Sequence, residues 1–153
     1  MASISIIYAS TSGHTEYVMQ ILGDALREAG QEVTTTRCEK AMAADLTKGD
    51  LTILACGTWN ADGVEGQLNP HMRAFFDRVK EADVSRTTLA IVGLGDARYR
   101  YTGRCIEHLQ KFRMAKKAAQ LLPPLLIVNE PYGQEERVRG WAQKVIAALS
   151  AKK

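Results

Sequence analysis

The chain has 153 residues, of which 46% are hydrophobic and 24% are charged. This length and composition are typical of one globular domain over residues 1–153, and they exclude a disordered, collagen-like or coiled-coil chain. The formal net charge of +3 is mildly basic and by itself says little about partners.

Short apolar runs alternate with longer stretches of helical periodicity along the chain. Residues 3–8 predict a buried strand, and residues 16–29 predict a helix because apolar residues recur at helical spacing and Gly30 follows as a stop. The later predicted elements are, in chain order, strands 32–36 and 50–56, a turn-rich segment 57–66, a helix 70–79 that Asn69 and Pro70 begin, strand 87–94, helix 104–115, strand 125–128 and helix 134–149.

Five strands that alternate with helices imply parallel strand–helix–strand units. The strands are continuous apolar runs rather than alternating patterns, as a sheet buried on both faces requires. The predicted fold class is therefore α/β, with a doubly wound parallel sheet covered by helices on both faces. Ligands of such folds bind beyond the carboxyl ends of the strands, so the loops after the first, third and fourth strands are the ones to inspect.

The first of these loops, residues 10–15, reads Ser-Thr-Ser-Gly-His-Thr and leads into the first helix. Small hydroxyl residues and a glycine let the backbone turn several N–H groups inward, and the helix start adds a partial positive charge. Such a loop can hold a phosphate dianion without a basic side chain. No lysine follows Gly13, which excludes a Walker A loop, and the lone glycine excludes a dinucleotide fingerprint. The alternative is that Ser10 or Ser12 simply caps the helix.

The other two loops each carry a large aromatic residue among polar neighbours. Trp59 follows the third strand, and Tyr99 follows the fourth. Two aromatics on neighbouring loops could sandwich a flat conjugated ring. Alternatively, Trp59 covers the end of the sheet and Tyr99 packs under its own loop. Together with the phosphate loop, the two aromatics favour a ligand with a phosphate at one end and a planar ring at the other.

These three segments closely resemble those of flavodoxins. Residues 10–16 are similar to the flavodoxin phosphate loop. Thr58-Trp59 resembles the pair that begins the loop over the inner face of the flavin, and Gly95-Asp96-x-x-Tyr99 resembles the motif that covers its outer face. The similarity runs nearly end to end, and the last strand has no room for the insertion that long-chain members carry.

The resemblance implies a short-chain flavodoxin: a five-stranded parallel sheet of order 2-1-3-4-5, one bound FMN, and low-potential one-electron transfer between redox partner proteins rather than enzymatic turnover. Residues 10–15 would bind the phosphate, Thr58 and Asp96 would contact the ribityl chain or the polar edge of the ring, and the two aromatics would stack on the ring. The implied cofactor-binding residues are Ser10, Thr11, Ser12, Gly13, His14, Thr15, Thr58, Trp59, Asn60, Ala61, Leu94, Gly95, Asp96, Tyr99, Tyr101 and Thr102.

The chain departs from the family pattern at two positions beside the ring. Asn60 stands where the short-chain pattern has a glycine, in a turn that favours a positive φ. We therefore expect the first reduction step of the flavin to be less favoured than in glycine-bearing relatives. Ala61 stands where relatives often carry an acid.

Basic residues gather in and after the third loop. Arg98 and Arg100 lie within the loop, whereas Lys111, Lys116 and Lys117 follow on the next helix, where we expect them to form a solvated face. Positive charge near the ring favours its anionic form, so we expect a low-potential couple less negative than in acidic flavodoxins. The same charge predicts redox partners with acidic docking surfaces.

Two alternatives on the same fold are a flavin reductase enzyme and a flavin-free protein-binding scaffold. A receiver domain is excluded because no acidic pair follows the first strand. The three histidines share no ligand spacing, so no metal is expected, and neither nucleic acid nor a membrane is an expected partner. The N-terminus is a poor signal peptide and the three cysteines form no C-x-x-C pair, so we expect a cytoplasmic, reduced protein. We also expect it to be a monomer.

Overall fold

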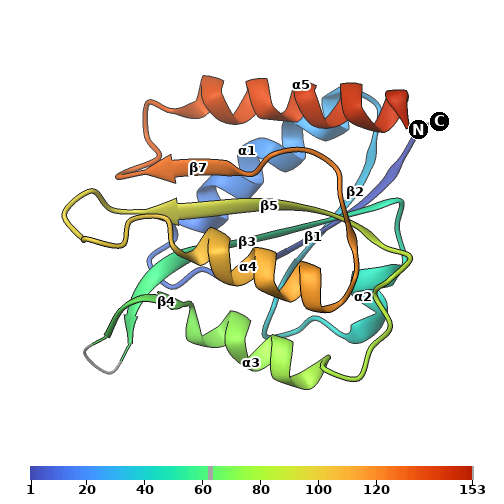
Figure 1. Cartoon of the computed structure of the whole chain (residues 1–153). Helices are drawn as coiled ribbons and strands as arrows, with labels where there is room; N and C mark the ends of the chain where they lie inside the picture. The colour runs from blue at the N-terminus through green and yellow to red at the C-terminus, as the bar shows by residue number, and fades with distance from the viewer. Residues whose placement is uncertain (62–63, 153) are drawn as a thin grey trace.

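A computed structural model describes residues 1–61 and 64–152. One sheet lies between two layers of helices, as Figure 1 shows. The elements are, in chain order, β1 (Ser3–Tyr8), α1 (His14–Glu28), β2 (Glu32–Arg37), α2 (Ala43–Thr47), β3 (Leu51–Ala61), β4 (Val64–Leu68), α3 (Pro70–Arg78), β5 (Thr88–Gly95), α4 (Cys105–Ala115), β6 (Ala119–Gln120), β7 (Leu125–Val128) and α5 (Glu135–Ala151). Every helix among the described residues falls short of the length and apolarity needed to cross a membrane.

The predicted strand order 2-1-3-4-5 is confirmed. Neighbouring parallel strands run β2-β1-β3-β5, and the fifth position is shared by two short strands, β6 and β7, that both pair with β5. Pro123 and Pro124 lie between these two strands. Because proline has no N–H to donate to the ladder, the edge strand is interrupted there.

The segment 57–66, predicted to be turn-rich, instead extends the sheet. β3 continues past Cys56 to Ala61 and pairs antiparallel with β4, with Thr58 opposite Leu68 and Trp59 opposite Gln67. The glycines and polar residues of this segment suggested turns, but the strand pairing overrides that local preference. The short elements α2, β4 and β6 were not predicted. Apart from the end of β3, the predicted elements lie within two residues of their observed bounds.

The apolar faces of the helices form a core on each side of the sheet. Helices α1 and α5 cover one face, and α3 and α4 cover the other (Figure 1). The first core includes Val18, Met19, Leu22 and Leu26 of α1 and Val138, Trp141, Val145 and Leu149 of α5. The second includes Met72 and Phe75 of α3 and Cys105, Leu109 and Phe112 of α4.

Lys116 does not belong to a solvated face as expected. Its Nζ donates to the backbone carbonyls of Val79 at 3.1 Å, Lys80 at 2.5 Å and Ala82 at 2.8 Å. These carbonyls belong to the segment that follows the end of α3 at Arg78. The ammonium therefore joins the carboxyl end of α3 to that of α4.

Gly93 of β5 lies where α4 packs most closely against the sheet. A Cβ at this position would be 2.4 Å from Cγ1 of Ile106 and 2.9 Å from Sγ of Cys105. Replacing Gly93 by alanine should therefore lower the free energy of unfolding by about 1–3 kcal/mol, the usual cost of overpacking a core. Urea denaturation measures this change.

Gly140 provides the matched control, because it lies on the exposed face of α5 and a Cβ there would meet nothing within 4 Å. Gly140→Ala should leave stability unchanged or raise it by up to about 1 kcal/mol, since alanine favours helix more than glycine does. A wild-type urea midpoint for Gly93→Ala would contradict the tight packing of α4 on β5.

Candidate functional site

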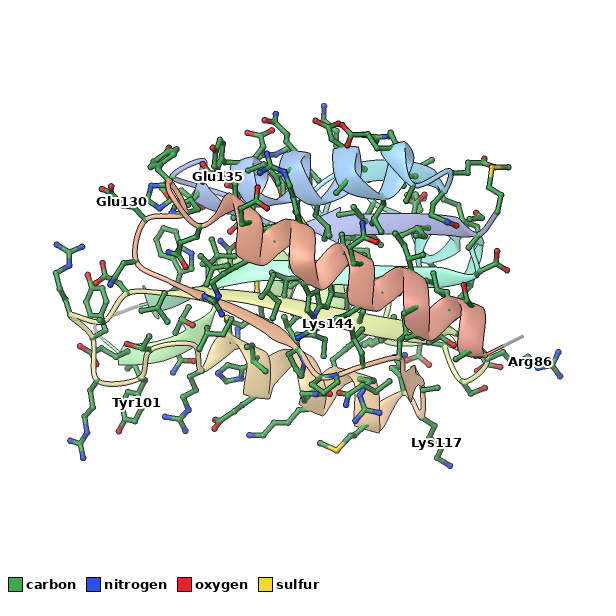
Figure 2. All side chains as sticks on the ribbon, turned by 90° about the horizontal axis from the view of Figure 1, so that it is seen from above. Arg86, Tyr101, Lys117, Glu130, Glu135 and Lys144 are labelled. Atoms are coloured by element: carbon green, nitrogen blue, oxygen red, sulfur yellow. The ribbon has the colours of Figure 1, made fainter. Side chains whose placement is uncertain are left out.

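The carboxyl ends of β1, β3 and β5 open onto a cleft of about 640 Å³. Its walls come from the three loops singled out in the sequence, residues 9–15, 57–59 and 94–99, together with Asn69 and the Asn129-Glu130 pair. Figure 2 shows Glu130 and Tyr101 at this end of the molecule and Arg86 and Lys117 at the opposite end. The topology thus brings the three predicted loops together at one edge of the sheet, as a doubly wound fold requires.

The loop 10–15 combines a helix cap with a set of free donors. Ser10 Oγ accepts a hydrogen bond from the N–H of Glu16 in the first turn of α1 at 3.3 Å, so Ser10 contributes to capping α1. Gly13 precedes α1 with a φ of 94°, a left-handed conformation that favours glycine, and does not itself line the cleft. Within the described part of the chain, the backbone N–H groups of residues 11–15 have no hydrogen-bond acceptor.

Asn69 adds another donor to the cleft, although its sequence position predicts only the start of a helix. Its side chain is almost wholly buried and Oδ1 accepts from the N–H of His71 at 2.9 Å, as a cap at the start of α3 does. Its Nδ2 is buried without a hydrogen-bond partner among the described residues. A buried amide left without a partner costs free energy, so a ligand that accepts from Nδ2 would be favoured here.

Trp59 and Tyr99 line the same cleft from neighbouring loops. Trp59 is half-buried at the end of β3, held by its pairing with β4, whereas Tyr99 is 45% exposed. Thr58 also lines the cleft, and its Oγ1 accepts from the N–H of Cys105 at 3.1 Å, which fixes the hydroxyl against the start of α4. The side chains of Asn60 and Ala61 lie outside the described residues.

The loop that follows β5 is held by its own side chains. The Asp96 carboxylate accepts from the N–H of Arg98 at 2.9 Å and from the Arg98 guanidinium at 2.5 to 3.0 Å. These hydrogen bonds from Arg98 lower the pKa of Asp96, so the carboxylate is ionised at neutral pH. Asp96, Leu94 and Gly95 line the cleft.

Tyr101 and Thr102 lie beside the cleft rather than in it. They line a much smaller cavity between this loop and the β3–β4 hairpin, which also touches Trp59 and Tyr99. The Tyr101 ring has the Arg104 guanidinium 4.6 Å from its centroid. The Thr102 hydroxyl lies 2.5 Å from the carbonyl oxygen of Asp96 and 2.7 Å from that of Tyr99, so Thr102 shapes the loop.

Asn129 is not among the predicted site residues, because it lies outside the three loops that the predicted topology indicates. It follows β7 at the same edge of the sheet, with a φ of 67° that asparagine tolerates better than most residues. Its N–H donates to the carbonyl of Gly95 at 2.8 Å and its Oδ1 accepts from the N–H of Ala97 at 2.9 Å. Asn129 therefore ties the end of β7 to the loop that carries Tyr99.

The donor set and the aromatic side chains of the cleft fit a flavin mononucleotide. Backbone N–H groups at the start of a helix of 15 residues suit a phosphate dianion. The hydroxyl side chain of Thr58 and the amide side chain of Asn69 line the cleft, as do two aromatic side chains. No group of three His, Cys, Asp or Glu side chains able to hold a metal ion is present in residues 1–61 and 64–152.

Comparison with known proteins agrees with this geometry. A family model described as flavodoxin matches residues 6–141. A flavodoxin of Nitratidesulfovibrio vulgaris is 27% identical over 150 residues, which cover 97% of this chain and 100% of the relative. A probable flavodoxin 2 of Bacillus subtilis is 30% identical over 137 residues, with 89% and 88% of the two chains covered.

A solved structure of oxidised flavodoxin 2 from Bacillus cereus superimposes with a TM-score of 0.84 at 26% identity, covering 99% of this chain and 100% of that one. The match extends over almost the whole chain and includes all the loops that form the cleft. The chain therefore belongs to the flavodoxin family, whose members are FMN-binding electron-transfer proteins rather than enzymes.

Proposed function

We propose that this flavodoxin holds one FMN in the cleft, with the phosphate on the loop 10–15 and the isoalloxazine ring against Trp59 and Tyr99. The observation that carries the proposal is the set of backbone N–H groups of residues 11–15, which lack acceptors in the described chain. All of these residues except Gly13 line the cleft that both aromatics also line. The bound FMN would supply the redox chemistry at its ring. Family membership does not favour the reductase or flavin-free alternatives.

The phosphate would be bound by backbone donors and hydroxyls, without a basic side chain in the loop. The Ser10 hydroxyl accepts from Glu16, which leaves its own proton to donate to the ligand. Thr15 is buried and lines the cleft next to the first turn of α1. The positive end of the helix dipole then favours the dianion.

The ribityl chain would lie between the phosphate loop and the ring, where Thr58 and Asn69 offer polar atoms. Nδ2 of Asn69 is the donor without a partner, and the Thr58 hydroxyl can donate because its oxygen accepts from Cys105. Asp96 has its carboxylate engaged by Arg98, so it would act on the flavin chiefly as a fixed negative charge at the edge of the ring.

The basic residues of the third loop are proposed to face acidic redox partners. Arg98 and Arg100 are exposed next to Tyr99, which is itself 45% exposed at the cleft. Opposite charges on two proteins raise the rate of encounter and orient them. A partner with an acidic docking surface would thus be guided to the edge of the cleft at Tyr99.

The setting of this activity also belongs to the proposal. We place the protein in the cytoplasm as a single-domain monomer over residues 1–153. The three cysteines are free and buried, which suits a reducing compartment where disulfides are rare.

The phosphate site is tested by comparing FMN with riboflavin, which lacks the phosphate. Thr15→Val removes one hydroxyl donor from the loop at nearly constant volume. It should weaken FMN binding by about tenfold or more, because a hydrogen bond to a charged group contributes about 1.5–3 kcal/mol. Riboflavin affinity should stay at the wild-type value. Equal losses for both ligands would refute the placement of the phosphate, and Thr34→Val on the exposed strand β2 is the control.

The ring site is tested through the two tryptophans. Trp59→Ala should weaken FMN and riboflavin alike, by about ten- to hundredfold, since burying an aromatic side chain contributes about 1.5–3 kcal/mol. In the wild type, flavin should quench the indole emission strongly, whereas in Trp59→Phe only the buried Trp141 of α5 remains and quenching should be weaker. Unchanged affinity for both flavins in Trp59→Ala would show that the ring lies elsewhere.

The docking surface is tested by charge reversal at two exposed arginines. Arg100→Glu should slow electron transfer to an acidic iron–sulfur ferredoxin by about tenfold at low ionic strength, and the difference should shrink as salt screens it. Arg86→Glu, at the opposite end of the molecule (Figure 2), makes the same change in net charge away from the cleft and should have little effect. Equal slowing by both variants would indicate only a net-charge effect.

A further inference from the structure

Arg37 is the last residue of β2, and its side chain reaches the phosphate loop from outside the cleft. One of its terminal nitrogens donates to the carbonyl oxygen of Ser10 at 2.5 Å. The other lies 3.4 Å from the Glu16 carboxylate, and Nε lies 3.3 Å from the carboxylate of Glu39. The guanidinium also lies over the ring of Tyr8. Arg37 itself does not line the cleft.

The hydrogen bond to Ser10 fixes the orientation of a peptide group at the start of the loop. The carbonyl of Ser10 and the N–H of Thr11 belong to the same peptide unit, and no peptide bond in the described chain is cis. In a planar trans peptide the C=O and the N–H point in opposite directions. When Arg37 holds the Ser10 oxygen on the outer side of the loop, the Thr11 N–H therefore points away from Arg37.

The contact with Glu16 keeps a negative charge away from the same site. Glu16 lies in the first turn of α1, where an anionic ligand would compete with it for the positive end of the helix. Its carboxylate accepts from the Tyr8 hydroxyl at 2.9 Å and lines a separate hollow with Tyr8 and Thr35. Glu16 does not line the cleft.

We propose that Arg37 is a positioning residue for the FMN phosphate: through the Ser10 carbonyl and the Glu16 carboxylate it orients the loop 10–15 with its donors toward the phosphate and its acceptors away. This inference rests on the proposed function, because it needs the phosphate to lie on that loop. The cation acts from the neighbouring strand, through the backbone, and without touching the ligand.

Arg27 offers a matched control within the same part of the fold. Its guanidinium lies 3.3 Å from Asp24 and donates to the carbonyl of Val33 at 3.3 Å, so it also joins α1 to β2. None of these contacts involves the loop 10–15. Replacing Arg27 should therefore affect the packing of α1 on β2 without changing how the loop treats a phosphate.

The experiment measures the dissociation constants of FMN and riboflavin for the wild type and for Arg37→Gln, Arg37→Lys and Arg27→Gln. Arg37→Gln should weaken FMN binding by about tenfold with little change for riboflavin, so that the preference for FMN falls. Arg37→Lys should lose part of that preference, because an ammonium has no fork to hold the carbonyl and the carboxylate together. Arg27→Gln should keep the wild-type preference.

A wild-type preference for FMN in Arg37→Gln would overturn the inference while leaving the proposed function intact. Should Arg37→Gln fail to fold, a wild-type preference in Arg37→Lys overturns it equally. If the wild type itself binds FMN no more tightly than riboflavin, the phosphate site is wrong, and the proposed function falls with it.

Discussion

The structure depends on one electrostatic constraint, the set of backbone N–H groups that the start of α1 leaves without partners. Every helix begins with such groups, and most are satisfied by a cap or by water. Here the hydroxyl of Ser10 accepts from the N–H of Glu16. The N–H groups of residues 11–15 have no acceptor in the described chain and lie beside a cleft. An anion at this position completes the hydrogen bonding of the helix, so ligand binding and local stability are coupled.

The sheet arranges the rest of the cleft around these N–H groups. Parallel pairing of β1, β3 and β5 brings their carboxyl ends to one edge, and this places Trp59 and Tyr99 on neighbouring loops. The hairpin of β3 and β4 supports Trp59, and Asn129 holds the loop of Tyr99 to the end of β7. The positions of these two aromatic side chains are thus set by backbone pairing rather than by side-chain packing alone.

Much of the fold could be predicted because its signals are local. The buried strands are uninterrupted apolar runs, and the long helices have apolar periodicity and a glycine or proline at their ends. The extension of β3 could not be predicted, since the residues after Cys56 favour turns and only the pairing with β4 makes them a strand. The role of Lys116 was missed for a similar reason, because the carbonyls that it contacts are 34 to 37 residues away in the sequence.

In the candidate site, too, residues in short sequence motifs could be predicted, whereas residues that act through tertiary contacts could not. The motifs at residues 10–15 and 58–59 and at Asp96 and Tyr99 were visible as short sequence patterns, and all contribute residues to the cleft. Asn69, Asn129 and Arg37 were not assigned to the site, because each acts through a contact that depends on the tertiary fold. The Arg37 contact with Ser10 joins the end of β2 to the loop after β1, across 27 residues of sequence.

The backbone amide signals of residues 11–15 in ¹⁵N-labelled protein test the account most directly. We predict that FMN shifts their amide protons far downfield, as charge-assisted hydrogen bonds do, and that riboflavin leaves them nearly unmoved. Unshifted amides in a protein saturated with FMN would contradict it.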